Sequence, residues 1–141
     1  MNISVGQKIY NLALDFYPIN RSLTGKGVLK SLEIISNYIA DYSGAKLYIH
    51  NVPTGYKAFD CDVPKEWDIE EAYIDDEYGN RIIDFKDNNL HVLGYSTSVD
   101  KWVSLEELKQ YIYTDENQKD AIPYVTSYYK ERYGFSMTYN Q

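Results

Sequence analysis

A loop rich in hydrogen-bond donors, residues 16–27, is the stretch of this sequence best suited to hold a ligand. It reads FYPINRSLTGKG and carries a guanidinium at Arg21 and hydroxyls at Ser22 and Thr24. A helix is predicted to begin near Gly25, and the free amides of a helix N-terminus stabilise a carboxylate or phosphate. We therefore expect these three side chains, together with Gly25, to bind a substrate. A capped connection between two helices explains the same residues equally well.

The TGKG of this loop resembles part of a phosphate-binding loop, but the complete pattern is absent. The pattern GxxxxGK[ST] requires glycine at the position of Asn20 and serine or threonine at the position of Gly27. The sequence therefore does not predict nucleotide binding here.

The other candidate nucleophiles and metal ligands form no recognised catalytic motif. Neither of the two histidines, His50 and His91, belongs to HExxH, HxH or HxD. The single cysteine, Cys61, excludes an internal disulfide and a thiolate metal cluster. We expect His50 on the surface or hydrogen-bonded, His91 in a packed sheet and Cys61 in a buried structural position, although a Cys–His pair stays open. No catalytic and no metal-binding residue is assigned in this chain.

The composition is that of an ordinary globular domain. The 141 residues suffice for one domain with a core, and 44% are hydrophobic and 25% charged. A net charge of −7 argues against nucleic acid as a partner, because nucleic-acid binding needs clustered Lys and Arg. The sequence shows no secretory signal pattern and no stretch near the roughly 20 apolar residues of a membrane span. A cytoplasmic location without a membrane partner is the default expectation.

Two helices and a strand are expected in the N-terminal third of the chain. The apolar spacing in VGQKIYNLALDF predicts a helix that ends before Pro18. A second helix is predicted over residues 25–42, with Thr24 as its N-cap and Gly44 as its C-cap. The two helices should pack as a hairpin around the donor-rich loop. A strand is then predicted over residues 46–52.

The middle and the end of the chain are expected to be richer in strands. A turn at residues 78–80 separates two strand-like runs and predicts a hairpin, and residues 90–96 are typical of a further strand. Ser104 begins a capping box that opens a short helix over residues 104–113. A last strand is predicted over residues 135–139.

Four motifs occur in order along residues 9–139. They are FYPINRSLTGKGV, VPTGYKAFDCDVPKEWDIEEAYI, DEYGNRIIDFKDNNLHVLGYSTSVDKWVSLEEL and IPYVTSYYKERYGF. Together they resemble the N-terminal part of a bacterial family of aminopeptidase-like proteins associated with polysaccharide biosynthesis. The family usually has tryptophan at the positions of Cys61 and Tyr133, and these two changes bear on packing more than on chemistry.

The resemblance implies an α+β or α/β fold, in which the helical hairpin and strand of a zinc-aminopeptidase-like domain are interrupted by a small β-rich inserted domain. Residues 1–53 and 124–141 would belong to the peptidase-like domain, and residues 54–123 to the insertion. The zinc-binding segment of the family, an H-x-C-H-P stretch followed by Asn-Asp, lies further along and has no match here. Zinc and a peptide or amide substrate are therefore expected for the full-length protein, and this N-terminal fragment is expected to be inactive alone.

Two functions of other classes stay open. The first is a non-catalytic module that binds glycans or a protein through its aromatic side chains, since the chain has 16 tyrosines. Trp67, Tyr73, Tyr95 and Trp102 on one exposed face would favour binding, whereas burial would favour a scaffold. The second is a structural or assembly role, in which an open sheet edge pairs between chains and forms a homo-oligomer.

Overall fold

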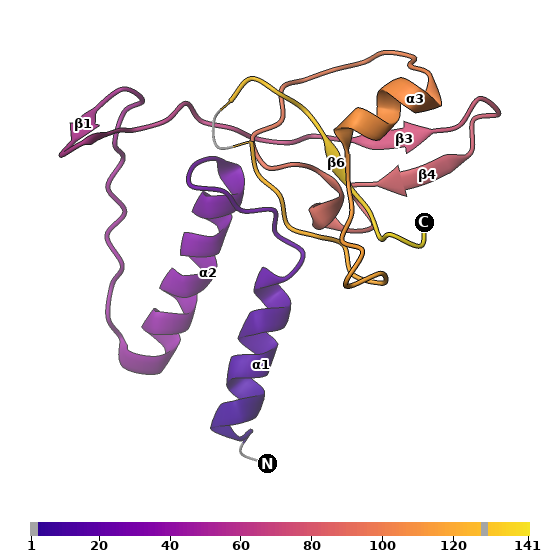
Figure 1. Cartoon of the computed structure of the whole chain (residues 1–141). Helices are drawn as coiled ribbons and strands as arrows, with labels where there is room; N and C mark the ends of the chain where they lie inside the picture. The colour runs from indigo at the N-terminus through magenta and orange to yellow at the C-terminus, as the bar shows by residue number, and fades with distance from the viewer. Residues whose placement is uncertain (1–2, 128–129) are drawn as a thin grey trace. The chain divides into compact units, whose positions relative to one another are not determined.

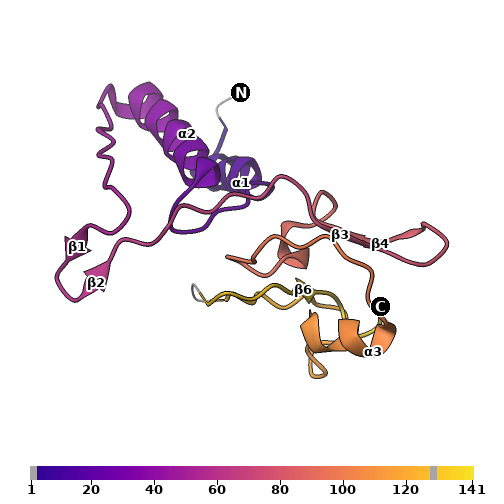
Figure 2. The same cartoon turned by 90° about the horizontal axis from the view of Figure 1, so that it is seen from above.

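The computed structural model describes residues 3–127 and 130–141 (Figures 1 and 2). Met1 and Asn2, and Tyr128 and Tyr129 of the fourth motif, lie outside the described residues. The chain divides into two units, Met1–Asp68 and Ile69–Gln141, and each is described by itself. The small α+β class is confirmed, because helices and short strands both occur. The inserted domain over residues 54–123 stays a prediction.

Two helices are the longest elements of the first unit (Figure 1). Helix α1 (Val5–Phe16) is capped by Ser4, whose Oγ accepts a hydrogen bond from a backbone N–H of the first turn at 3.2 Å. Helix α2 (Lys26–Ser43) ends at Gly44, whose N–H donates to the carbonyl of Ala40 at 2.9 Å. Both predicted helices and the predicted C-cap are confirmed.

The helical hairpin leaves most of its apolar side chains in solvent. The two helices run antiparallel, since Nζ of Lys8 near the start of α1 lies 5.6 Å from the ring centroid of Tyr42 near the end of α2. Within the described part of this unit, residues 3–68, Ile19 is the one buried apolar side chain and Ser31 the one buried polar side chain. The first unit therefore has no apolar core of its own among these residues.

The remainder of the first unit is extended chain and one small hairpin. The strand predicted over residues 46–52 is wrong, because this segment pairs with no strand among the residues that the structure describes and so forms no ladder of hydrogen bonds. Strands β1 (Lys57–Ala58) and β2 (Cys61–Asp62) pair antiparallel around a two-residue turn. Cys61 is exposed in β2, so the buried position expected for it is also wrong.

The second unit begins with the hairpin that the sequence predicts. Strands β3 (Tyr73–Asp75) and β4 (Arg81–Asp84) pair antiparallel, with Ile74 opposite Ile83 and an irregularity in the pairing after Ile74. Ile83 is buried, whereas the turn residues between the strands are polar or exposed. Both the turn at residues 78–80 and its flanking strands are confirmed.

The strand predicted over residues 90–96 is present only in part. Its first residues belong to a 3-10 helix, η1 (Asn89–His91). Beyond it, Val92 and Gly94 each make a single β-bridge, to Phe135 and to Thr126 respectively. The segment therefore contacts two later stretches of chain in turn and forms no continuous ladder with either.

A short helix and a parallel strand pair complete the second unit. Helix α3 (Leu105–Leu108) continues into the 3-10 helix η2 (Lys109–Tyr111). Ser104 caps α3 as predicted, since its Oγ accepts the N–H of Glu107 at 3.2 Å. The helical stretch ends two residues earlier than expected, because strand β5 (Ile112–Tyr113) pairs parallel with strand β6 (Phe135–Ser136). The last strand is confirmed but is shorter than predicted.

Among the described residues of the second unit, 69–127 and 130–141, the buried apolar side chains are Ile83, Val92 and Leu93. Leu93 is completely buried, and its N–H donates to the carbonyl of Gly134 at 3.0 Å. A Cβ on Gly134 would lie 2.7 Å from the ring of Tyr113, so only glycine permits this close approach. The second unit thus has a small core, located where the chain after η1 meets the start of β6.

Candidate functional site

The donor-rich loop lies between α1 and α2, and two of its donors, Arg21 and Thr24, contact the protein's own backbone. Nη1 of Arg21 donates to the carbonyl oxygen of Phe16 at 2.7 Å, and the guanidinium lies 5.2 Å from the centroid of the Phe16 ring. Oγ1 of Thr24 donates to the carbonyl of Lys65 at 3.5 Å, and Ser22 is half-buried in the same loop. Arg21 therefore caps the C-terminal end of α1, where a cation is favoured by the helix dipole.

The N-terminus of α2 is occupied by a carboxylate from far along the chain. The N–H of Lys26 donates to Oδ1 of Asp68 at 2.6 Å. Gly25 is the N-cap, with φ +99°, so the prediction of Thr24 as N-cap is wrong. A side chain at position 25 would collide with the carbonyl oxygen of Trp67, and glycine avoids that collision. The chain itself thus supplies the anion that a helix start attracts.

Asp68 has a direct consequence for the expected binding residues. It accepts a hydrogen bond from an amide that we expected to face a substrate, so an anionic ligand must bind beside Asp68 or displace it. The role of Arg21, Ser22, Thr24 and Gly25 in substrate binding stays a prediction. Sequence reasoning missed Asp68 because its partner lies 42 residues away, and no local spacing signals such a contact.

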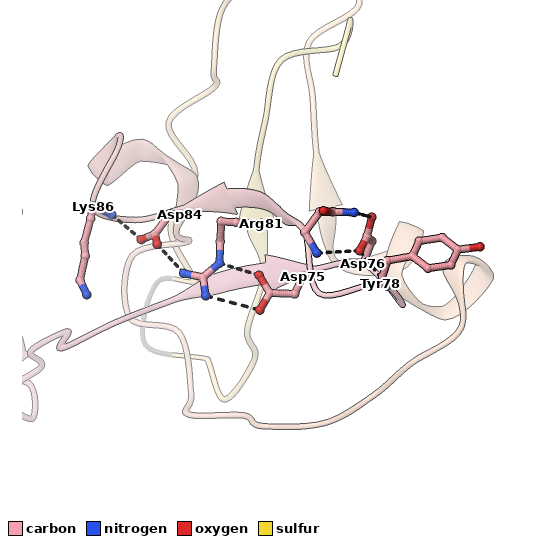
Figure 3. Close-up of polar contacts among 7 residues, drawn as sticks. Asp75, Asp76, Tyr78, Arg81, Asp84 and Lys86 are labelled. Carbon is pink, nitrogen blue, oxygen red and sulfur yellow. Dashed lines mark hydrogen bonds and ion pairs between the residues drawn. The ribbon is translucent and has the colours of Figure 1, made fainter.

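A second polar cluster lies on the β3–β4 hairpin (Figure 3). Nε of Arg81 donates to Asp75 and Nη1 donates to Asp84, each at 2.5 Å. The guanidinium also lies 3.6 Å from the ring centroid of Tyr73. The pKa of Asp84 is lowered chiefly by the backbone N–H of Lys86, which donates to its carboxylate at 2.8 Å. The pair of Arg81 with Asp75 joins the two strands and therefore helps to fix their register, whereas Arg81 and Asp84 both lie in β4.

Asp76 organises the turn of the same hairpin (Figure 3). Its carboxylate accepts hydrogen bonds from the backbone N–H groups of Tyr78 and Asn80 at 2.9 and 2.8 Å, and from the Asn80 side-chain amide at 2.8 Å. These bonds, the Asn80 amide foremost, lower the pKa of Asp76 below its ordinary value. The carboxylate thus acts as a turn-forming acceptor.

The histidines do not form a metal site with their neighbours. His91 is buried, and its Nδ1 lies 2.8 Å from the carbonyl oxygen of Ser136, which confirms a structural role, although the residue belongs to the 3-10 helix η1 and not to a sheet. His50 is exposed on the extended segment of the first unit. Within residues 3–127 and 130–141, no three His, Cys, Asp or Glu side chains are arranged to hold a metal ion. The described residues therefore do not fit the zinc that the family resemblance implies for the longer protein.

A lysine in the second unit is held between a carboxylate and two aromatic rings. Nζ of Lys101 donates to Oε1 of Glu107 at 2.7 Å and lies 5.5 and 5.4 Å from the ring centroids of Tyr111 and Tyr133. The two rings stack with their centroids 4.2 Å apart. The hydrogen bond to Glu107 is the main reason that the pKa of Lys101 is raised. The lysine is therefore kept protonated and suits a structural contact better than a nucleophile.

The four aromatic residues that could form a binding face have different environments. Trp102 is 81% exposed, whereas Tyr73 stacks on the guanidinium of Arg81. Trp67 and Tyr95 are half-buried. Because these side chains differ in exposure, they are not established as one exposed aromatic face. Glycan or protein binding through them stays a prediction.

Comparison with known proteins places this chain in a family. Residues 66–141 match the family described as "Domain of unknown function (DUF2172)", and this match covers more than half of the chain. The chain therefore belongs to the DUF2172 family. The match includes Asp68, the β3–β4 hairpin and the whole of the second unit.

Two relatives from Clostridium acetobutylicum extend the match into the first unit. A curated protein, provisionally named as a polysaccharide biosynthesis protein with an aminopeptidase-like domain, is 51% identical over 136 residues. A crystal structure of a provisionally named peptidase is also 51% identical and superposes with a TM-score of 0.89. Each match covers 96% of this chain, but only 30% of the curated protein and 31% of the solved chain. The chain thus spans about a third of the length of its relatives, and the resemblance inferred from the four motifs is confirmed.

The helices were also compared with the requirements for crossing a membrane. Among the described residues, no helix combines the length and the apolar character needed to span a bilayer.

Proposed function

We propose that this chain is the N-terminal part of an aminopeptidase-like hydrolase linked to polysaccharide biosynthesis, and that it is inactive alone. The observation that carries the proposal is the match at 51% identity and TM-score 0.89 over 96% of the chain. Because the same match covers only 31% of the solved relative, the catalytic groups are assigned to the remaining part of such a polypeptide. A cytoplasmic location belongs to the same proposal.

Zinc belongs to the proposal for the longer protein, where it would activate water for attack on a peptide or amide carbonyl. In this chain the proposed contribution is substrate binding. Arg21, Ser22 and Thr24 would hold a substrate carboxylate beside the start of α2. The charge of Asp68 at that point would oppose this binding, so the ligand is expected to compete with its hydrogen bond to Lys26.

The proposal is tested with a hybrid protein in which this chain replaces the matched 136 residues of the curated Clostridium relative. We expect the hybrid to hydrolyse chromogenic aminoacyl amides and to lose this activity on treatment with a zinc chelator and regain it with added zinc. The free chain should show no hydrolysis under the same conditions. A hybrid that folds and binds zinc but cleaves none of a panel of aminoacyl amides and short peptides would contradict the proposed function.

The binding role of the loop has its own test in the same hybrid. Arg21→Ala should raise KM for substrates with a free carboxylate and leave KM for the corresponding amidated substrates unchanged. Arg21→Lys is the matched control, because it retains the charge but not the fork of donors. Equal KM values for Arg21→Ala and the parent hybrid would exclude the loop as a carboxylate site.

A further inference from the structure

We draw no further inference here: the strongest candidate, the fully exposed side chain of Phe59 on a left-handed backbone at the turn of the β1–β2 hairpin, carries no proposal because nothing in the structure shows what covers it.

Discussion

The two units of this chain bury their apolar side chains to very different extents. In the second unit, Leu93 is completely buried and the chain around it is joined by β-bridges and backbone hydrogen bonds. In the described part of the first unit, two helices of 12 and 18 residues accompany a single buried apolar side chain, Ile19. Helices of this length are marginal in water unless they pack against something. The difference indicates that the second unit has a small apolar core that stabilises it, whereas the described residues of the first unit offer little apolar burial to stabilise its two helices.

The largest effect on stability is expected for a leucine of the second unit, and a leucine of the first unit provides the comparison. Leu93→Ala removes a fully buried side chain and should cost about 2–5 kcal/mol of unfolding free energy. Leu29→Ala in α2 removes a side chain that is 48% exposed. It should cost less than about 0.5 kcal/mol. Urea unfolding followed by tyrosine and tryptophan fluorescence measures both changes. Similar losses of unfolding free energy in the two variants would contradict the difference between the units.

Two glycines sharpen the comparison, because replacing each by alanine should change stability in opposite directions. Gly134→Ala pushes a methyl group against the ring of Tyr113 and should destabilise the second unit by about 1–3 kcal/mol. Gly6→Ala, in an open part of α1, should stabilise that helix by about 0.5–1 kcal/mol. Thermal unfolding and helical circular dichroism provide the readouts. A destabilising Gly6→Ala would show that the surface of α1 is already covered.

Asp68 joins the end of the first unit to the start of α2, and its removal should have a smaller, local effect. Asp68→Ala deletes the acceptor for the N–H of Lys26 and should cost about 0.5–1 kcal/mol, because the contact is exposed to solvent. Exchange of the first-turn amides of α2 should rise. Asp60→Ala, in the turn between β1 and β2, is the control and should leave those amides unchanged.

The smallest effect is the pH dependence contributed by Asp76. Hydrogen bonds from Asn80 hold its folded-state pKa below the ordinary value of 3.8. The carboxylate therefore stabilises the folded chain above pH 3.8, and this contribution is lost as the pH falls through the lower folded-state pKa. In urea unfolding, the stability difference between the parent and Asp76→Asn should be constant near neutral pH and shrink in acid. A difference that stays constant through that acid range would contradict this role.

The features predicted from the sequence are those specified by nearby residues. Both helices of the first unit follow from apolar spacing, and the β3–β4 hairpin follows from its turn residues. The capping of α3 by Ser104 is equally local. Such features need no knowledge of distant chain, because every atom that decides them lies within a few residues.

The features that were missed depend on contacts between distant residues. The segment over residues 46–52 alternates like a strand but has no strand partner within residues 3–127 and 130–141. The start of α2 at Gly25 is decided by the carbonyl of Trp67 and the carboxylate of Asp68, and neither is signalled in the local sequence. For the same reason, the donor residues of the candidate site were predicted while Asp68 beside them was not.

Amide hydrogen exchange along the free chain tests the central claim most directly, because it reports on both units in one sample. The N–H groups of Leu93 and Gly94, bonded to the carbonyls of Gly134 and Val125 at 3.0 and 3.1 Å, should be strongly protected. The N–H groups in the middle of α1 should exchange nearly as fast as those of an unfolded peptide. Equal protection of α1 and of the Leu93 segment would contradict the account, since the first unit would then be stable without further contacts.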